Sequence, residues 1–213
     1  MNVFLNSEVA DVYDAYYESS VGQKVNEIET ALMEDALAPL QKCRLLELGC
    51  GTGHWTEFFC HKGFEVLAVD SSEAMLKHAR AKNIGAEFLA ANAADLPFPN
   101  HSFEAVASVT MLEFVPDVDQ VLGEIDRVLQ PGGWLLLACL NGNSALAKNA
   151  PNDPVFREAR FFTPESLSVK LARFGAADLS FGVHFSADFQ IMDNAPDEAK
   201  HEPAFMLARV QKK

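Results

Sequence analysis

Three glycines at alternate positions constrain the fold of this chain more than any other feature. Residues 47–53 read E-L-G-C-G-T-G, after a short apolar run and before a predicted helix at residues 55–61. A strand that enters a helix through three glycines makes a turn in which a ligand can lie against backbone amides. The dinucleotide fingerprint is G-x-G-x-x-G, so the spacing here argues against a nicotinamide-dependent oxidoreductase.

Composition and charge narrow the class of protein. A chain of 213 residues, 49% of them hydrophobic, suits one domain with a substantial core. The formal net charge of −13, with no cluster of Lys or Arg, disfavours nucleic acid and membrane surfaces as partners. There is no apolar run of transmembrane length and no signal-peptide pattern. The four cysteines show no metal-ligand spacing and are expected to be small buried residues, so we expect a cytoplasmic protein without a metal site.

Strand-like runs and helical periodicity alternate along the chain. Two helices are expected before residue 40, the first capped by Ser7. Strands are expected at residues 43–48, 65–69, 86–90, 103–109 and 134–140, with helices between them that include 72–82 and 118–129. Then follow a loop at 141–152, a helix that starts at Thr163-Pro164, and strands at about 178–185 and 204–210. This order predicts an α/β domain with a doubly wound sheet.

The helix at 118–129 has the clearest end signals. Asp117 is expected to cap it, with Gln120 in the capping-box position. The sequence Pro-Gly-Gly at 131–133 is expected to end it before the next strand. No internal repeat interrupts the pattern.

Four segments together resemble the class I S-adenosylmethionine-dependent methyltransferases, in the type 11-like branch that acts on small molecules. They are residues 47–53, V-L-A-V-D-S-S at 66–72, A-N-A-A-D-L-P-F-P at 91–99, and residues 109–117 leading to R-V-L-Q-P-G-G at 127–133. The resemblance implies a Rossmann-like, doubly wound seven-stranded sheet with its last strand antiparallel and helices on both faces. It also implies one domain over 1–213, with an N-terminal helical lid (1–40), a cofactor-binding core (41–140) and a C-terminal substrate-side part (141–213).

The resemblance implies S-adenosylmethionine as cofactor and S-adenosylhomocysteine as product. Gly49, Gly51 and Gly53 would pack against the methionine part, and Glu47 would help to hold its ammonium group through water. The alternative for Glu47 is a solvated carboxylate at a strand end.

The next segment would bind the ribose. Asp70, with Ser71 beside it, would accept hydrogen bonds from both ribose hydroxyls, and it can also help to cap the helix that begins near Ser72. Met75 lies one turn into that helix, where it either covers the adenine or belongs to the core.

The third segment would bind the adenine. The leading acid of the family pattern is Asn92 here, so its amide oxygen would accept from the adenine amino group without charge. The N–H of Ala93 would donate to the ring and Leu96 would pack against it. Asp95 either substitutes for Asn92 or caps the turn.

Residues after the fourth expected strand would face the reacting atoms. Val109 and Thr110 are expected beside the cofactor sulfur. Glu113 is the candidate catalytic residue, as a general base or as a balance for the sulfonium charge, and the alternative is a solvated carboxylate. The family chemistry is an in-line displacement that mainly needs alignment and exclusion of water, so a base is required only for some acceptors.

Segments outside the repeating frame are expected to supply the lid and the acceptor contacts. Tyr17 is expected to close over the cofactor, whereas Tyr13 is expected to pack its helix on the sheet. Further candidates are Asn141 and Ser144 at the ligand edge, Arg157 and Arg160 as an anion clamp or as surface ion pairs, His54 and His184 as proton handlers or structural residues, and Trp55 as a wall of the pocket.

The acceptor is expected to be a small molecule. Neither an N-P-P-Y or D-P-P-Y segment after the fourth strand nor a Pro-Cys pair is present, which argues against methylation of nucleic-acid bases. A non-catalytic S-adenosylmethionine-binding assembly or regulatory protein is the alternative function. Either is expected to be a monomer or a homodimer.

Overall fold

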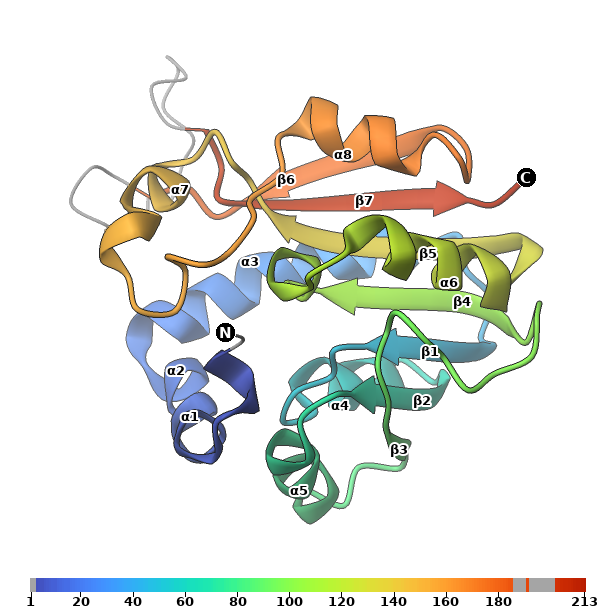
Figure 1. Cartoon of the computed structure of the whole chain (residues 1–213), viewed down its shortest axis with the longest axis horizontal. Helices are drawn as coiled ribbons and strands as arrows, with labels where there is room; N and C mark the ends of the chain where they lie inside the picture. Colours follow the sequence, from blue (N-terminus) through green and yellow to red (C-terminus); the bar gives the residue numbers. More distant parts are fainter. Residues whose placement is uncertain (1–2, 186–190, 192–201) are drawn as a thin grey trace.

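A single mixed sheet organises the chain (Figure 1). The computed structural model describes residues 3–185, 191 and 202–213. The seven strands have the order β3-β2-β1-β4-β5-β7-β6, and β7 is antiparallel to both of its neighbours while the other pairings are parallel. The predicted doubly wound sheet with an antiparallel last strand is confirmed. The strands are β1 (Arg44–Leu48), β2 (Glu65–Asp70), β3 (Glu87–Ala90), β4 (Phe103–Val109), β5 (Leu129–Leu140), β6 (Ala177–Gly182) and β7 (Phe205–Gln211).

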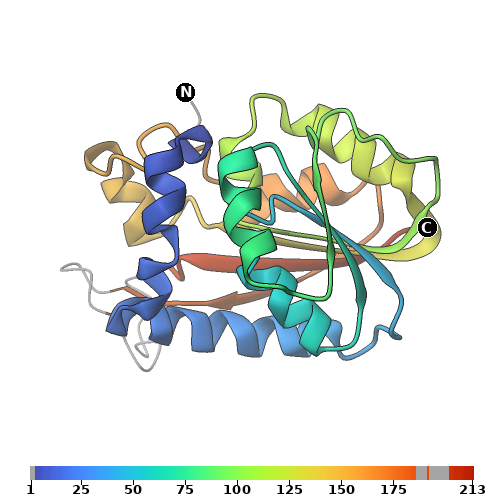
Figure 2. The same ribbon diagram turned by 90° about the horizontal axis from the view of Figure 1, so that it is seen from below.

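Helices cover both faces of the sheet, as expected (Figure 2). One face carries α3 (Ser20–Leu37), α4 (His54–His61) and α5 (Glu73–Ala81), and the other carries α6 (Val118–Val128) and α8 (Pro164–Leu171). Successive strand residues point to opposite faces, so Leu45 joins the cluster under α3 and α4 while Leu46 joins the cluster under α6 and α8. The central strands read as continuous apolar runs because both of their faces are buried.

The N-terminal segment lies across the edge of the sheet where β1 and β4 end (Figure 1). It contains η1 (Val3–Leu5), α1 (Ser7–Tyr13) and α2 (Ala15–Glu18), and α1 packs against α5. Asn6 caps α1 by accepting a hydrogen bond from the Glu8 N–H at 3.0 Å, so the expectation that Ser7 is the cap is wrong by one residue. Among the helices of the described residues, none combines the length and apolar character needed to cross a bilayer.

Three expected boundaries differ in the structure. The segment expected as a loop or short insertion at residues 141–152 is helical from residue 145 onward, because α7 (Ala145–Asn149) and η3 (Ala150–Asn152) form behind an N-cap at Ser144. The fifth strand begins at Leu129 instead of 134, since Gly132 and Gly133 exchange backbone hydrogen bonds with Lys212 and so extend the ladder. The sixth strand ends at Gly182, because the next residue, Val183, has a positive φ of 60°. Residues 186–190, beyond the expected end of that strand, lie outside the described residues.

Two smaller expectations are also wrong in part. Asp117 does cap α6 by accepting from the Gln120 N–H, but the Gln120 side chain donates to the Ala94 carbonyl instead of closing a capping box. All four cysteines are free thiols, and Cys50 and Cys139 are buried, whereas Cys43 and Cys60 are only half-buried. Cys43 lies one residue before β1 and is not part of the strand.

Candidate functional site

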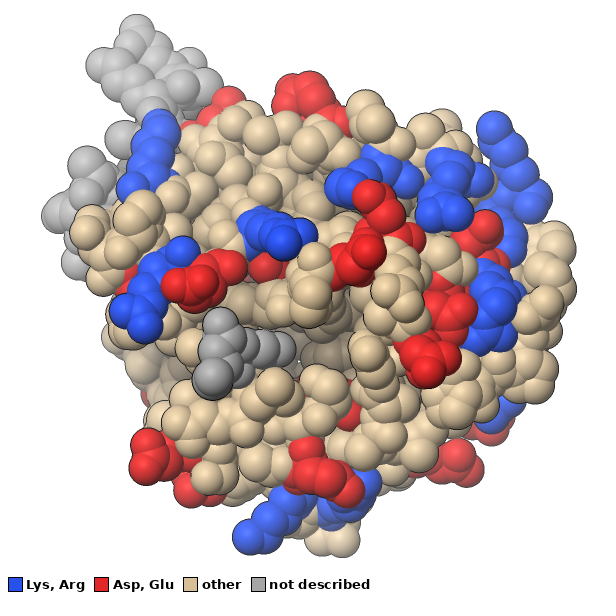
Figure 3. Space-filling view, viewed as in Figure 1, with Lys and Arg blue, Asp and Glu red and all other residues tan. Residues whose placement is uncertain are grey.

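The candidate site lies at the carboxyl ends of β1 and β4. The chain runs from β1 outward to β2 and β3, and then crosses back to place β4 on the other side of β1. In open α/β sheets the crevice at such a reversal of strand order is where ligands bind. The space-filling view from the same side shows a hollow near the centre of this face, with mostly uncharged side chains around it (Figure 3).

The glycine turn follows β1 directly and has only one open position. Gly49, Gly51 and Gly53 all have positive φ angles, of 74°, 53° and 85°. A side chain at Gly49 would overlap Met111, and one at Gly53 would lie 3.2 Å from the Ala79 Cβ on α5. A Cβ at Gly51, in contrast, would have its nearest neighbour 4.0 Å away. Gly49 and Gly53 are therefore required by packing, whereas at Gly51 only the edge of the Tyr13 ring comes within 4.0 Å.

Asp70 joins the glycine turn to the start of α5. Its Oδ2 accepts a hydrogen bond from the Gly51 N–H and its Oδ1 accepts one from the Ser72 N–H, both at 2.8 Å. Burial raises the pKa of Asp70 above its ordinary value, although these backbone N–H groups act against the shift. Ser72 is the N-cap of α5, so the helix-starting role of Asp70 is present in the structure. Its ribose role stays a prediction, with Ser71 exposed beside it.

Glu47 is buried beneath the turn, with 2% of its surface exposed, so the solvated alternative is wrong. The Thr56 hydroxyl on α4 donates to Glu47 Oε2 at 2.6 Å. Burial raises the pKa of Glu47 to about 8, with a further contribution from the Asp70 charge, while the Thr56 bond opposes the shift. A carboxyl of this kind is largely neutral at pH 7 and gains from a cationic partner.

Glu113 is also buried, at 1% exposure, and the solvated alternative is wrong for it too. It lies in η2 (Leu112–Phe114), and its Oε1 accepts from the Leu140 N–H at 2.5 Å. Its Oε2 has no hydrogen-bond partner among the described residues. Burial raises the pKa of Glu113 to about 7 despite the Leu140 bond. One oxygen is thus fixed by the backbone, and the other keeps its full capacity to accept a proton.

The chain between β4 and η2 is locally strained. Thr110 has φ of 46°, a left-handed conformation that is a genuine outlier for a β-branched residue. The Thr110 N–H donates to the Ala138 carbonyl at 2.8 Å, which continues the pairing of β4 with β5. Val109, the last residue of β4, is 8% exposed. Strain of this kind clusters at functional sites, and here it turns the chain at the expected position of the cofactor sulfur.

The expected adenine residues lie beyond β3. Asn92 is exposed and its Oδ1 accepts from the Ala94 N–H at 3.0 Å, while its carbonyl accepts from the Asp95 N–H at 2.9 Å. Leu96 is buried, at 4%, and Met75 on α5 is buried, at 1%. Ala93, the residue after Asn92 in this loop, is half-buried. The structure thus fixes the shape of this loop, and its adenine contacts stay predictions.

The N-terminal tyrosines are arranged differently from our expectation. The atom nearest to a Cβ built on Gly51 is Cε1 of Tyr13, so Tyr13 lies over the turn and does not simply pack α1 on the sheet. Tyr17 stacks on His54 with ring centroids 3.7 Å apart, and the two tyrosine side chains are hydrogen-bonded to each other. Tyr17 therefore reaches the turn through Tyr13 and His54 in this structure.

Asp14 fastens this segment to the turn itself. The Thr52 hydroxyl, between Gly51 and Gly53, donates to Asp14 Oδ1 at 2.6 Å, and Lys82 pairs with Asp14 Oδ2 at 2.7 Å. Burial favours a higher pKa for Asp14, but the bonds from Lys82 and Thr52 outweigh it and lower the pKa. The carboxylate is therefore ionised at neutral pH and holds α1 and α2 on the site.

His54 and Trp55 have structural surroundings. Burial, with help from the Lys82 charge, lowers the pKa of His54 to about 4, and its Nε2 lies 2.7 Å from Asn26 Oδ1. A neutral, hydrogen-bonded imidazole fits the structural alternative. Trp55 is 6% exposed and packs against Phe58 and Phe59 in the core, so the expectation that it walls the pocket is wrong.

The acceptor-side candidates mostly support the backbone. Ser144 and Asn141 are fully buried, and the Ser144 hydroxyl donates to the Asn141 carbonyl at 2.6 Å while capping α7. The Arg160 guanidinium donates to the Pro116 carbonyl at 2.9 Å, a contact that is neither a clamp nor an ion pair. Arg157 is exposed. His184 lies after the end of β6 and not within it.

Four aromatic rings contact one another in a row that includes the residue after Glu113. Phe4 contacts Phe114 with centroids 4.8 Å apart, and Phe114 contacts Phe156 at 6.4 Å. Phe156 in turn contacts Phe161 at 6.2 Å. These rings come from three separate segments of the chain, and Phe114 lies in η2 next to Glu113.

Sequence reasoning missed two groups that shape the site. Asp14 sits among the tyrosines without any local signal, because its partners Thr52 and Lys82 are distant in sequence. Arg127 and Glu124 of α6 bind the loop that carries Leu96, as described below. The R-V-L-Q-P-G-G segment at 127–133 was noted only as part of a motif, and the contacts of its arginine depend on the tertiary structure.

Known protein families match the central part of the chain. Residues 46–137 match the family model described as a methyltransferase domain. The ubiquinone biosynthesis O-methyltransferase of Thiobacillus denitrificans is 34% identical over 116 residues, which are 52% of this chain and 50% of that protein. The demethylmenaquinone methyltransferase of Clavibacter sepedonicus is 39% identical over 105 residues, 48% of this chain and 43% of that protein. The chain therefore spans about half the length of these curated relatives.

Solved structures match nearly the whole chain. A protein from Thermotoga maritima, described as an S-adenosylmethionine-dependent methyltransferase and possible histamine N-methyltransferase, superposes with a TM-score of 0.76. The match covers 98% of this chain and 99% of the other, at 24% sequence identity. At that level of identity the likeness shows a shared fold.

Proposed function

We propose that the chain is a class I S-adenosylmethionine-dependent methyltransferase that transfers a methyl group to a small-molecule acceptor, because residues 46–137 match the methyltransferase-domain family model. The observation that carries the proposal is the turn after β1. Among the three glycines of the turn only Gly51 has no neighbour closer than 4.0 Å to a built Cβ, and the acids of β1 and β2 lie directly beneath and beside it. No other part of the described chain joins an open backbone turn to two such carboxyl groups at the sheet's reversal point.

We assign the methionine part of the cofactor to the turn and the nucleoside to its surroundings. Glu47, mostly neutral when the site is empty because burial raises its pKa to about 8, gains a cationic partner in the ammonium group. Asp70 accepts from the ribose hydroxyls. The proposed contact residues are Tyr17, Glu47, Gly49, Gly51, Gly53, Asp70, Ser71, Met75, Asn92, Ala93, Leu96, Val109 and Thr110. Tyr13, which lies over Gly51, joins this set.

The bound cofactor supplies an activated methyl carbon, and the protein aligns the acceptor with it and excludes water. Tyr13 and the N-terminal helices cover the turn, which supports a role as a lid. Glu113 is the proposed base, since the hydrogen bond from Leu140 fixes its Oε1 and leaves its Oε2 to take the acceptor's proton. Held by the turn and by Asp70, S-adenosylmethionine would supply the methyl group to the acceptor's lone pair and would leave as S-adenosylhomocysteine.

A small molecule is the proposed acceptor because the named relatives act in ubiquinone and menaquinone biosynthesis and because the chain is acidic. Its net charge of −13 opposes the approach of nucleic acid. The aromatic row from Phe4 to Phe161 supports an acceptor with an apolar body. The cysteines and the lack of a targeting pattern in these residues support a cytoplasmic setting.

Isothermal titration calorimetry tests the proposal first. We expect S-adenosylmethionine and S-adenosylhomocysteine to bind one site per chain in the micromolar range. The control is Gly51→Val, which puts a branched side chain into the open side of the turn and should abolish binding while the chain stays folded. Wild-type protein that shows no heat with either ligand would contradict the cofactor assignment.

Turnover then separates an enzyme from a cofactor-binding regulatory protein. Mass spectrometry of quinol, phenol, amine and thiol panels with labelled S-adenosylmethionine should reveal a methylated product. With that acceptor, the wild-type rate should rise with pH through about 7, where Glu113 ionises, and Glu113→Gln should lose this rising limb. Binding without turnover of any acceptor in the panel would favour the regulatory alternative.

A further inference from the structure

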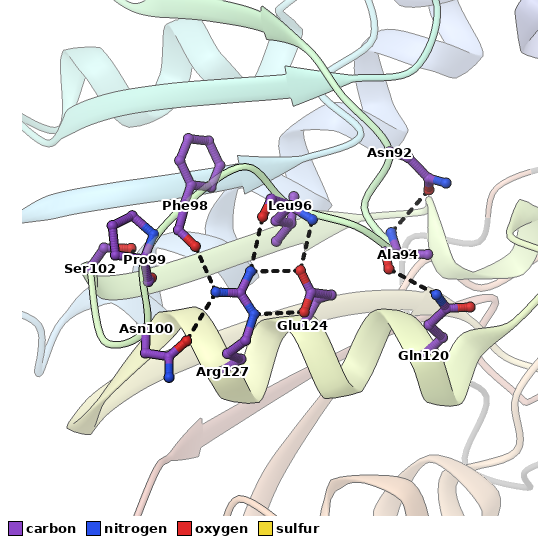
Figure 4. A network of polar contacts seen from close by, with 10 residues as sticks. All are labelled: Asn92, Ala94, Leu96, Phe98, Pro99, Asn100, Ser102, Gln120, Glu124 and Arg127. Atoms are coloured by element: carbon purple, nitrogen blue, oxygen red, sulfur yellow. Dashed lines mark hydrogen bonds and ion pairs between the residues drawn. The ribbon is translucent and has the colours of Figure 1, made fainter.

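The loop at residues 92–100 is held from outside by side chains of α6 (Figure 4). Its own backbone makes few bonds: the Asp95 N–H donates to the Asn92 carbonyl, and Pro97 and Pro99 have no N–H to donate. Leu96 packs into the core at 4% exposure and Ala93, Ala94 and Phe98 pack partly against it, while Asp95, Pro97, Pro99 and Asn100 are exposed. The shape of the loop therefore depends on contacts that it does not make for itself.

Arg127 and Glu124 supply most of those contacts. They form a bidentate ion pair one turn apart on α6, with both nitrogen–oxygen distances at 2.7 Å. Glu124 Oε2 accepts from the Leu96 N–H at 2.7 Å, and Arg127 Nη2 donates to the Leu96 carbonyl at 2.9 Å. Both backbone groups of Leu96 are thus paired with charged side chains, which are strong hydrogen-bond partners.

Side chains of α6 also bind the loop on both sides of Leu96. Arg127 Nη1 donates to the Phe98 carbonyl at 2.6 Å and to Asn100 Oδ1 at 3.1 Å. One turn earlier on α6, the Gln120 amide donates to the Ala94 carbonyl at 3.0 Å. A planar guanidinium holds several acceptors in a fixed fork geometry, which the compact, rotatable ammonium of a lysine does not reproduce. The pKa of Glu124 is lowered, chiefly by its bond with Arg127, so the pair is charged throughout the neutral range.

We infer that Arg127, held by Glu124, is a positioning residue that sets the preference of the site for adenine over other purines. The inference rests on the proposed function, in which Asn92, Ala93 and Leu96 face the base. Adenine is recognised through an amino group that donates and a ring nitrogen that accepts, and the two contacts require the Asn92 side chain and the Ala93 N–H to lie within hydrogen-bond distance of the base edge. A loop fixed at Ala94, Leu96 and Phe98 presents that edge in one geometry only.

Two ligands that differ only at the base test this inference. S-adenosylhomocysteine and S-inosylhomocysteine share the ribose and the amino-acid part, but the second has an oxo group in place of the amino group. Calorimetry should show that the wild type prefers the adenine ligand by about tenfold or more. Arg127→Met should reduce this preference to roughly twofold, and Arg127→Lys should recover little of it, because the charge returns without the fork.

Lys212→Met is the matched control. Lys212 donates to the carbonyls of Asp126 and Leu129 at the same end of α6, but it makes no contact with the loop. The control should lower the melting temperature much as Arg127→Met does and keep the full preference for adenine. Gln120→Ala is a milder variant for the case in which Arg127→Met does not fold, and it should lower the preference roughly twofold to threefold through the Ala94 contact alone.

The outcomes separate this inference from the proposed function. If Arg127→Met or Gln120→Ala loses affinity equally for both ligands, the contacts of α6 with the loop only stabilise the fold, and the inference is overturned. If the wild type binds both ligands equally well, the loop does not read the base, and again only the inference fails. If the wild type binds neither ligand, the proposed function fails and the inference fails with it.

Discussion

At the scale of single residues, Glu47, Gly51 and Asp70 lie together at one edge of the sheet, where the Gly51 N–H donates to the Asp70 carboxylate. The glycine spacing and the acids at the ends of β1 and β2 predicted that these three residues would meet. The sequence could not show that Glu47 and Glu113 are buried, because burial depends on which distant residues cover them. Nor could it show that Tyr13, and not Tyr17, lies over Gly51, since both belong to one stripe of a short amphipathic segment.

The three glycines should not be equivalent. Gly49→Ala places a methyl group on Met111, whereas Gly51→Ala only reaches the edge of the Tyr13 ring at 4.0 Å, and both carry the penalty of about 1–2 kcal/mol for a side chain in left-handed backbone. We therefore expect Gly49→Ala to lower the free energy of unfolding more than Gly51→Ala, measured by urea denaturation. Gly51→Ala should instead weaken S-adenosylhomocysteine binding. An equal loss of stability in the two variants would show that Met111 relaxes without cost.

Glu47 should link cofactor binding to proton release. Because burial raises its pKa to about 8 and an ammonium partner favours the ionised form, binding at pH 7 should release a proton from the wild type. Calorimetry in buffers of different ionisation enthalpy measures that number directly. Glu47→Gln should bind about tenfold more weakly and release none of it. Proton release that persists unchanged in Glu47→Gln would assign the linkage to another group.

At the scale of secondary-structure elements, long periodic segments were predictable and short or irregular ones were not. The stripe of α6 and its Asp117 cap identified that helix from sequence alone. The five residues of α7 are too few to show a period, and its cap at Ser144 was read as a ligand residue instead. The start of β5 was hidden because Pro131 and Gly132 are typical of turns, yet Lys212, the residue after β7, pairs with Gly132 and Gly133.

The attachment of α1 and α2 should govern how fast the cofactor leaves. Asp14→Asn removes the Lys82 ion pair and weakens the Thr52 bond, so the N-terminal helices should open more often. We expect S-adenosylhomocysteine to dissociate roughly threefold faster, as stopped-flow fluorescence can measure, in line with the modest strength of partly exposed ion pairs. Glu34→Gln breaks a comparable pair with Lys62 away from the site and should leave dissociation unchanged. Identical dissociation rates in wild type and Asp14→Asn would show that opening of the N-terminal helices does not limit release of the ligand.

At the scale of the whole molecule, the fold was predictable because each level of the sequence pointed the same way. Alternating strands and helices, a glycine turn after the first strand and acids at strand ends are all consistent with one doubly wound sheet. The sequence did not predict the contacts between distant segments, such as the hydrogen bonds from Arg127 on α6 to the loop at residues 92–100. Those contacts join residues about thirty positions apart, and no local pattern specifies them.

The stability of the protein should fall as the pH rises above neutrality. Burial raises the pKa of Glu29 and Glu47 to about 8 and of Glu113 to about 7, so the folded chain holds more protons than the unfolded chain from about pH 5 to 8. His54 acts in the opposite sense, but only below about pH 6.5, because its folded pKa is about 4. Between pH 6.5 and 8 the glutamates act alone, and the free energy of unfolding should drop by about 1 kcal/mol or more.

Urea denaturation at the two pH values measures this drop. Glu47→Gln should reduce the difference, since one of the three carboxyls no longer ionises, while Glu34→Gln at the surface should not. Equal stability of the wild type at pH 6.5 and pH 8 would mean that water reaches these carboxyls in solution.

The position of β7 has a consequence for biosynthesis. In the described sheet β6 pairs only with β7, and β7 comes after every other strand in the sequence while it lies between β5 and β6. As the nascent chain leaves the ribosome, β5 therefore waits with an unpaired apolar flank until Phe205–Gln211 emerges. Such a flank invites association with neighbouring chains, and chaperones would have most to protect in that interval.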